Sequence, residues 1–155
     1  MSEKMTLQID SPEEMIGLGR RIGALLKGGE VLELVSDIGG GKTTLVRGIA
    51  EGAGSSDQVM SPTFTISRIY QSDDVEIRHF DFYRLDEPGI IAAELEESLA
   101  TEGVVVVIEW SDIVKGVLPD ERLRIDIKAA EKDTIRTVTF NPEGDRYQSL
   151  VKELA

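Results

Sequence analysis

Helix-like and strand-like hydrophobic patterns alternate along this chain. Apolar residues recur at helical spacing over 15–26, after a capping-box pattern at 11–14, and Gly28-Gly29 is expected to end this first helix. The apolar run at 31–35 predicts a strand, and a second helix is expected to follow a glycine-rich segment and continue through about Ala53. The N-terminal third is therefore expected to contain a helix, a strand, a loop and a helix.

The middle of the chain predicts a hairpin, a helix and a buried strand. Two extended runs, 63–70 and 75–83, are separated by Ser72-Asp73-Asp74, and this pattern favours a hairpin. A helix fits residues 90–100. The run at 104–108 is apolar at every position, which is typical of a strand buried on both faces of an α/β sheet.

The C-terminal third predicts a second hairpin and a final helix. Alternation over 123–127 and 135–140, with a turn at 129–133, predicts the hairpin. The last helix is expected from about Pro142, and its apolar side, which either packs on the core or docks a partner, contains Tyr147, Leu150, Val151 and Leu154. Together these elements predict a single α/β domain over residues 1–155, with a central mixed sheet, helices on both faces and β-hairpins.

The glycine-rich segment after the first predicted strand carries the most specific chemistry. It reads Ser36-Asp37-Ile38-Gly39-Gly40-Gly41-Lys42-Thr43-Thr44. Glycines allow successive backbone N–H groups to point at an anion, and the start of a helix adds positive potential. Lys42 is expected to reach the outer phosphates of a nucleotide, and the Thr43 hydroxyl to ligate Mg²⁺. The segment therefore predicts a P-loop, with a nucleotide bound by Gly39, Gly40, Gly41, Lys42, Thr43 and Thr44.

The match to the full P-loop pattern is incomplete, because position 36 is serine where the pattern has glycine. Ser36 is small enough to take the turn with modest strain. The alternative interpretation is that Gly39-Gly40-Gly41 is only a flexible turn. The position of the segment between a buried-strand pattern and a helix favours the phosphate site.

Two acidic residues follow extended runs, where a magnesium–nucleotide site needs carboxylates. Glu109 follows the run at 104–108, and Asp81 lies at the end of the run that begins near Val75. Glu109 fits an indirect Mg²⁺ contact or a residue that positions the attacking water, and Asp81 fits a direct or water-mediated Mg²⁺ ligand. Spacing does not separate these roles. The predicted catalytic residues are Lys42, Asp81 and Glu109, and the predicted metal ligands are Thr43, Asp81 and Glu109.

Several neighbours of these acids have two interpretations. Trp110 either covers the nucleotide or packs in the core. His79, the only histidine, is expected to fill a half-buried strand position rather than transfer protons. Arg84 is expected to pair with one of the two acids or to face a phosphate. Ser61-Pro62-Thr63 resembles a switch loop that senses the γ-phosphate, although read alone it is a strand-entry turn.

Two missing features narrow the nucleotide chemistry. Guanine-specific P-loop proteins commonly carry an Asn-Lys-x-Asp segment, whereas the only asparagine here, Asn141, is followed by proline. Adenine is therefore expected, and ATP with Mg²⁺ is the predicted ligand. No arginine stands out as one that neutralises charge in the transition state, so the isolated chain is expected to hydrolyse ATP slowly.

Composition limits the location and the partners. The 155 residues include no cysteine, which excludes disulfides, thiolate metal sites and cysteine nucleophiles. Seventeen basic and 29 acidic residues give a formal net charge of −12, so any nucleic-acid role is expected to be indirect, through a partner. The longest apolar run is 104–108 and the first residues lack a signal-peptide pattern, so a cytoplasmic location without membrane contact is expected.

Four further motifs, taken with the phosphate loop, resemble the TsaE family, also called YjeE, in order and spacing over nearly the whole chain. They are Ser61-Pro62-Thr63-Phe64-Thr65, His79-Phe80-Asp81-Phe82-Tyr83-Arg84-Leu85, Ile108-Glu109-Trp110 and Leu118-Pro119. The chain departs from the family pattern at Ser36, where the family has glycine, and at Gly40, where alanine is usual. The helical segment at 89–99 matches loosely.

The resemblance implies an ATPase that works with TsaD and TsaB in the synthesis of threonylcarbamoyladenosine in tRNA. It implies that ATP binding and hydrolysis reset or sustain the TsaD–TsaB assembly, and that tRNA is contacted only indirectly. By likeness, residues 39–44 hold the phosphates, Thr43 and Glu109 hold Mg²⁺, and Asp81 assists hydrolysis or metal binding.

Two other classes of function remain open at this point. A small-molecule kinase also combines a phosphate loop with a small α/β domain, but it needs a basic lid, and the candidate arginines are scattered at Arg68, Arg78, Arg122 and Arg124. A non-hydrolytic binding module would use ATP only to hold the switch loop in one state.

Overall fold

The computed structural model describes residues 4–36, 41–60, 67–83, 85, 89–129 and 135–155. Within these residues the chain forms seven strands, four α-helices and one short 3₁₀ helix. In chain order they are β1 (Met5–Ile9), α1 (Pro12–Leu25), β2 (Val31–Val35), α2 (Lys42–Gly52), β3 (Ser67–Gln71), β4 (Glu76–Asp81), α3 (Gly89–Ala100), β5 (Val104–Glu109), η1 (Ser111–Val114), β6 (Arg122–Ala129), β7 (Arg136–Glu143) and α4 (Asp145–Leu154).

The seven strands form one mixed sheet in the order β1-β7-β6-β2-β5-β4-β3. The four central strands β6, β2, β5 and β4 run parallel to one another. At the edges the pairing is antiparallel, with β7 against β6, β1 against β7, and β3 against β4. The predicted central mixed sheet is confirmed. In α/β sheets, ligands bind at the edge formed by the carboxyl ends of the parallel strands.

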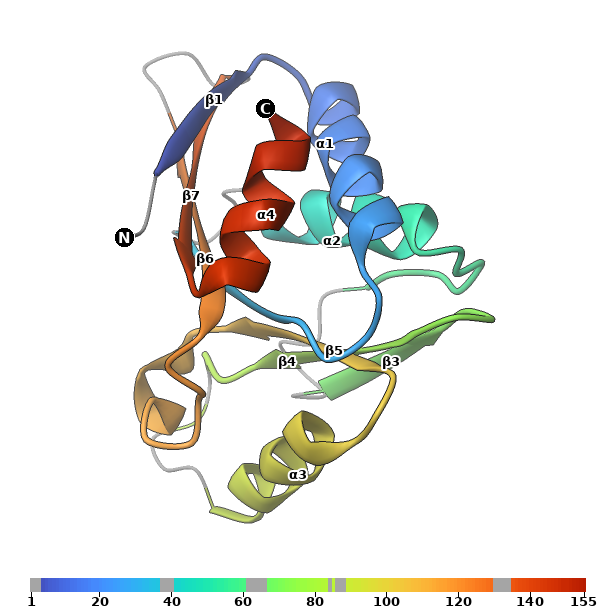
Figure 1. The fold of residues 1–155 in the computed structure, drawn as a ribbon, viewed down its shortest axis with the longest axis vertical. Coiled ribbons are helices and arrows are strands. Elements are labelled where there is room, and N and C mark those ends of the chain that lie inside the picture. Colours follow the sequence, from blue (N-terminus) through green and yellow to red (C-terminus); the bar gives the residue numbers. More distant parts are fainter. Residues whose placement is uncertain (1–3, 37–40, 61–66, 84, 86–88, 130–134) are drawn as a thin grey trace.

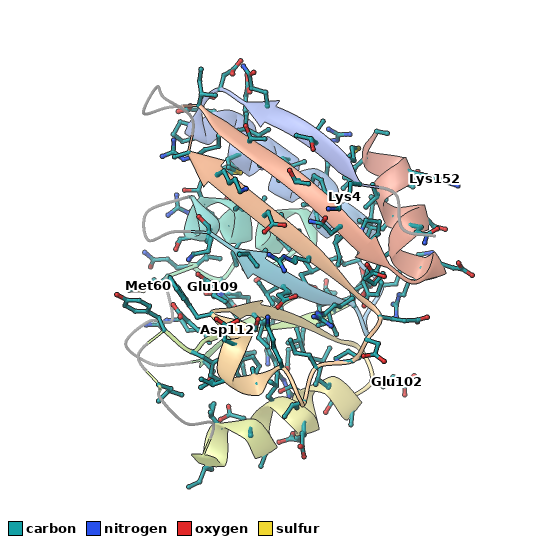
Figure 2. The ribbon with its side chains drawn as sticks, turned by 90° about the vertical axis from the view of Figure 1, so that its left-hand side faces the viewer. Lys4, Met60, Glu102, Glu109, Asp112 and Lys152 are labelled. Atoms are coloured by element: carbon teal, nitrogen blue, oxygen red, sulfur yellow. The ribbon has the colours of Figure 1, made fainter. Side chains whose placement is uncertain are left out.

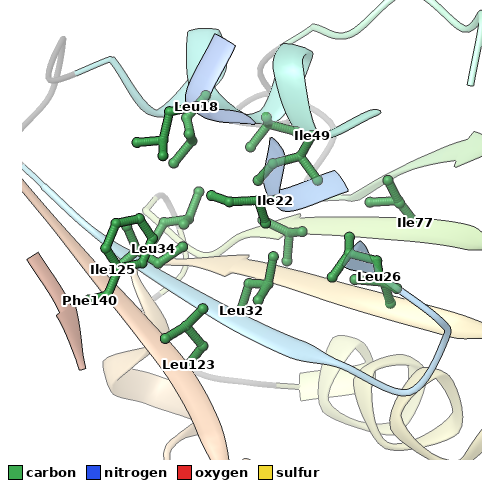
Figure 3. Packing of buried hydrophobic residues seen from close by; sticks show 14 of the residues in the cluster. Leu18, Ile22, Leu26, Leu32, Leu34, Ile49, Ile77, Leu123, Ile125 and Phe140 are labelled. Atoms are coloured by element: carbon green, nitrogen blue, oxygen red, sulfur yellow. The ribbon is translucent and has the colours of Figure 1, made fainter. Parts of the chain in front are cut away.

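Helices cover both faces of the sheet, as predicted (Figure 1). The helices α1, α2 and α4 pack on one face, and α3 packs on the other. In Figure 3, Leu18 and Ile22 of α1 and Ile49 of α2 lie over Leu32 and Leu34 of β2. Period-2 alternation in the buried strands divides their apolar side chains between the two layers. Strand β5 therefore contributes side chains to both layers, whereas Leu32 and Leu34 of β2 belong to the layer under α1 and α2.

The backbones of α1 and α2 touch through glycines. A Cβ added at Gly19 would lie 2.4 Å from Leu45 O and 2.8 Å from the Cα of Gly48. A Cβ added at Gly48 would lie 2.2 Å from Ile16 O. Only glycine fits at these two positions, and the close contact fixes α2, the helix that carries Lys42, against α1.

Most predicted elements are confirmed. The cap of α1 forms as expected, with the Ser11 hydroxyl accepting from Glu14 N at 3.1 Å. The predicted helix at 90–100 is α3, and the predicted buried strand at 104–108 is β5, which continues to Glu109. The first hairpin is β3 with β4, and residues 63–66 of its predicted first strand lie outside the described residues.

One expectation about the C-terminal part needs correction, and two features were not predicted. The last helix begins at Asp145 rather than near Pro142, because β7 continues to Glu143 and pairs Pro142 with Leu123. Among the described residues, the ladder of β1 with β7 stops at the pair of Met5 and Phe140, and Pro142 lies beyond it. Strand β1 was not anticipated, and β6 does more than form a hairpin, since it also joins β2 in the parallel core.

Candidate nucleotide-binding site

The candidate residues meet at one edge of the sheet because β2, β4 and β5 are parallel. The register pairs Asp81 with Glu109, and Leu34 of β2 also lies opposite Glu109. The segment that follows β2 therefore begins beside Glu109, and Asp81 lies on the far side of Glu109. Figure 2 shows Glu109 at the same end of the sheet as Met60 and Asp112, whereas Glu102, before β5, lies toward the other end.

Helix α2 begins at this edge. Gly41 is its N-cap residue and has φ +101°, a left-handed conformation that favours glycine. Among the described residues no side-chain hydrogen bond caps this helix start, so its first-turn N–H groups are candidates to bind an anion. Lys42, Thr43 and Thr44 form that first turn. The predicted phosphate ligands Gly39 and Gly40 lie outside the described residues.

Lys42 is buried and points toward the acids rather than toward solvent. Its Nζ lies 3.3 Å from the carbonyl oxygen of Ser36, 3.6 Å from Oε1 of Glu109 and 4.8 Å from the centre of the Trp110 ring. The ammonium group therefore sits between the start of the loop, the end of β5 and an aromatic face.

His79 is fully buried beside Glu109, so the expectation of a half-buried filler was wrong. Its Nε2 lies 2.5 Å from Oε2 of Glu109, and its Nδ1 lies 3.3 Å from the hydroxyl of Tyr70. Sequence reasoning missed this contact because it requires the register of β4 against β5. The available signal was the period-2 spacing that puts His79 and Asp81 on one face of β4.

Asp81 is also buried, and it accepts a hydrogen bond from Tyr83 N at 2.9 Å. It lies on the same face as Glu109, because directly opposite residues of neighbouring strands share a face. The two acids are therefore brought together, as the predicted metal site requires. Arg84 and Ser61-Pro62-Thr63 lie outside the described residues.

Trp110 turns the chain away from the sheet directly after Glu109. Its φ of +56° makes it the one non-glycine residue with positive φ in the described part of the chain, and such a conformation is strained for a bulky side chain. Its ring lies 4.8 Å from the ring of Tyr83 and packs partly against the cluster under α3. Trp110 therefore packs partly in the core, as one of its two interpretations predicts, and its ring also contacts Lys42.

A buried charge network supports this turn, and nothing in the sequence had pointed to it. Glu33 of β2 accepts hydrogen bonds from the Ser111 hydroxyl and, at 2.9 Å, from Arg122 Nε. Burial alone would raise the pKa of Glu33, but these hydrogen bonds and the charges of Arg122 and Arg124 outweigh it and hold this pKa below its usual value. The network ties β2, η1 and β6 together beside Trp110.

A cavity of about 130 Å³ opens next to this network. Its lining includes Glu33, Ser36, Trp110, Lys115 and Arg124. It therefore lies between the start of the phosphate loop and the turn after β5.

The described residues contain no group of three or more His, Asp or Glu side chains placed to hold a metal. Two carboxylates, those of Asp81 and Glu109, lie side by side at this edge of the sheet. In the part of the chain that the structure describes, no helix has the length and apolar character needed to cross a membrane.

Helix α2 follows β2, a central strand of the parallel core, with Gly41 as its N-cap and the buried Lys42 in its first turn. This arrangement defines an α/β protein with the P-loop NTPase fold. The model of one protein family, described as threonylcarbamoyl adenosine biosynthesis protein TsaE, matches residues 9–138. The chain therefore belongs to the TsaE family. The family inferred from the motifs is confirmed.

Similar proteins agree over most of the chain. A Bacillus subtilis protein named tRNA threonylcarbamoyladenosine biosynthesis protein TsaE is 40% identical over 145 residues, which cover 94% of this chain and 90% of that protein. A Streptomyces coelicolor protein of the same name is 38% identical over 135 residues, covering 84% and 91%. The crystal structure of YdiB from Bacillus subtilis matches with a TM-score of 0.84 at 37% identity, covering 99% of this chain and 95% of that one.

Proposed function

We propose that this chain is a Mg²⁺-dependent ATPase that acts with TsaD and TsaB in the threonylcarbamoyladenosine modification of tRNA. The observation that carries the proposal is the placement of Lys42 in the first turn of α2, after the left-handed Gly41, with its Nζ 3.6 Å from Glu109 Oε1. Membership of the TsaE family supports the biological role.

The residues present fit a triphosphate with magnesium. Residues 39–44 would hold the phosphates through backbone N–H groups, and Lys42 would neutralise the outer phosphates. The Thr43 hydroxyl and the carboxylates of Asp81 and Glu109 would hold the metal, which supplies positive charge that polarises the phosphates when bound. Glu109 is the residue we assign to orienting the attacking water, because it is the carboxylate in contact with Lys42.

The base is proposed to be adenine, with Trp110 close to the nucleotide. The absence of an Asn-Lys-x-Asp segment supports adenine, and the Lys42 contact supports the position of Trp110. The acidic balance of the chain supports an indirect role at tRNA, through TsaD and TsaB, in the cytoplasm. Hydrolysis is proposed to support turnover of that partner complex and to be slow without it.

The direct test measures ATP binding and phosphate release by the full chain, with and without TsaD and TsaB. Lys42→Ala should weaken ATP binding by at least about 10-fold, because the buried cation that faces the phosphates is lost. Glu109→Gln should keep ATP binding and lower kcat by about 100-fold or more. Wild-type turnover in both variants would contradict the ATPase proposal. If the wild-type chain binds ATP but releases no phosphate, even with TsaD and TsaB, the remaining interpretation is a non-hydrolytic ATP-binding module.

A further inference from the structure

A buried line of hydrogen bonds reaches Glu109 from the side opposite Lys42. The Tyr70 hydroxyl donates to the carbonyl oxygen of Met60 at 2.9 Å and lies 3.3 Å from His79 Nδ1. His79 Nε2 lies 2.5 Å from Glu109 Oε2. Tyr70 and His79 are both buried, so water does not compete for these contacts.

The number of hydrogens fixes the direction of these bonds. A tyrosine hydroxyl has one hydrogen, and Tyr70 gives it to the Met60 carbonyl. The hydroxyl must therefore accept at His79, so the hydrogen of that contact is on Nδ1. Burial raises the pKa of Tyr70, which keeps the hydroxyl in its protonated, donating form. The imidazole ring is thus held in one orientation, with Nε2 directed at Glu109 Oε2. Two lone pairs would repel each other at 2.5 Å, so one hydrogen lies in this contact as well.

This orientation assigns a separate partner to each oxygen of Glu109. Oε2 is taken by His79, and Oε1 faces Lys42. The last torsion of a glutamate side chain is broad and only weakly restricted by its own geometry, so external contacts decide where the carboxylate points. Without His79, the carboxylate would be free to rotate, and either of its oxygens could face Lys42.

We propose that His79 is a positioning residue for Glu109, and that the Tyr70 hydroxyl in turn positions His79. His79 acts through Glu109 and is not assigned a contact with the nucleotide. The inference rests on the proposed ATPase function and adds to it the residues that aim its carboxylate. Partners of this kind, one step removed from the reacting groups, typically contribute about 10- to 100-fold to activity.

The test uses substitutions that keep or remove one nitrogen at a time. In His79→Gln the amide nitrogen can take the place of Nε2, whereas in His79→Asn it can take the place of Nδ1. His79→Leu removes both contacts, and Tyr70→Phe removes only the hydroxyl. Val105→Ala is the matched control, because Val105 is fully buried in the same cluster as Tyr70 and lies on β5 away from the acids.

Each variant of the full chain is assayed for ATP affinity and for ATP hydrolysis with TsaD and TsaB. His79→Leu and His79→Asn should lower kcat by about 10- to 100-fold while ATP affinity stays within about 2-fold. His79→Gln should retain most of the activity. The kcat of Tyr70→Phe should lie between those of His79→Gln and His79→Leu. Val105→Ala should lose stability but keep kcat, which separates positioning from general destabilisation.

Three outcomes would overturn the inference. The first is wild-type kcat in a folded His79→Leu variant. The second is an equal loss in His79→Gln and His79→Leu, since a purely structural role would not distinguish a donor from an apolar group. The third is a His79 ring without a hydrogen on Nδ1. It can be detected by ¹⁵N NMR of the untagged chain, in which His79 is the only histidine.

Failure of the proposed function gives a different pattern. If the wild-type chain releases no phosphate with TsaD and TsaB, the ATPase proposal falls, and this inference falls with it. If the wild type is active and Glu109→Gln is not, the ATPase proposal stands, and the His79 variants alone decide the inference.

Discussion

Asp81 and Glu109 lie side by side as register partners on the parallel strands β4 and β5, and both are buried. Two neighbouring carboxylates repel each other unless a cation lies near them. Lys42 contacts Glu109, and a bound Mg²⁺ would serve both acids. The two acids have different surroundings among the described residues, since Glu109 contacts Lys42 and His79 and Asp81 accepts from Tyr83 N.

Asp81→Asn should therefore act mainly on the metal. We expect the Mg²⁺ concentration for half-maximal ATPase activity to rise by at least about 10-fold, because one anionic ligand is lost. The measurement is a Mg²⁺ titration of phosphate release at saturating ATP, with Glu109→Gln compared side by side. An unchanged Mg²⁺ requirement in an active Asp81→Asn variant would remove Asp81 from the metal site.

The emission of Trp110 should report on Lys42 even without nucleotide. Trp110 is the only tryptophan, and the lysine Nζ lies 4.8 Å from the centre of its ring. Removing this cation in Lys42→Ala should shift the emission of the folded chain, because the electric field at the ring changes. Lys152→Ala, on the distant helix α4, is the control and should leave the spectrum unchanged (Figure 2). Identical spectra for all three proteins would argue against the contact.

The contact between α1 and α2 predicts a large difference between two Gly→Ala substitutions. In Gly48→Ala the new Cβ would lie 2.2 Å from the backbone oxygen of Ile16, so the helices must separate. We expect a loss of about 3 kcal/mol or more in the free energy of unfolding, at the upper end of overpacking effects. Gly17→Ala on α1 is the control, since its Cβ would meet nothing within 4 Å.

Urea denaturation with a common m-value measures both variants. Gly17→Ala should be neutral or stabilising by up to about 1 kcal/mol, because alanine is the better helix former. Equal stabilities for the two variants would show that the helices are not in close backbone contact.

Glu33 should make the stability of the fold depend on acid pH. Its hydrogen bonds with Ser111 and Arg122, together with nearby positive charge, more than offset the effect of burial and hold its pKa below the usual value of 4.5. A carboxyl whose pKa is lowered by folding stabilises the folded state at pH values above that usual value. This contribution is lost as the pH falls from 4.5 through the lower pKa of the folded state.

Glu33→Gln should therefore cost about 1–3 kcal/mol at pH 7, because a buried acceptor for Arg122 is weakened. The difference from the wild type should shrink as the pH is lowered below 4.5, since the wild-type carboxyl then becomes neutral as well. The measurement compares the unfolding free energies of the wild type and Glu33→Gln at pH 7 and in acid. Glu96→Gln, at an exposed position of α3, is the control. A difference that stays constant with pH would contradict this role.

Local patterns in the chain were sufficient for most of the elements. Two examples are the Ser11 cap and the apolar run of β5. Each depends on residues close in sequence, so its conformation follows from short-range rules. The same holds for Gly41 at the start of α2. The failures lie at positions decided by distant partners. Pro142 stays in a strand because β7 continues alongside β6 and pairs Pro142 with Leu123, which no local pattern near Pro142 contains.

The same division applies to the candidate site. The amino-acid sequence by itself determined that a glycine-started helix follows a buried strand, that acids follow two other strands, and that the motifs match the TsaE family. Only the tertiary structure decided that Lys42, His79 and Glu109 touch, because that contact depends on the register of parallel strands joined by long crossovers. Strand register is set by packing of the whole sheet, and a one-residue slip would turn His79 and Glu109 to opposite faces.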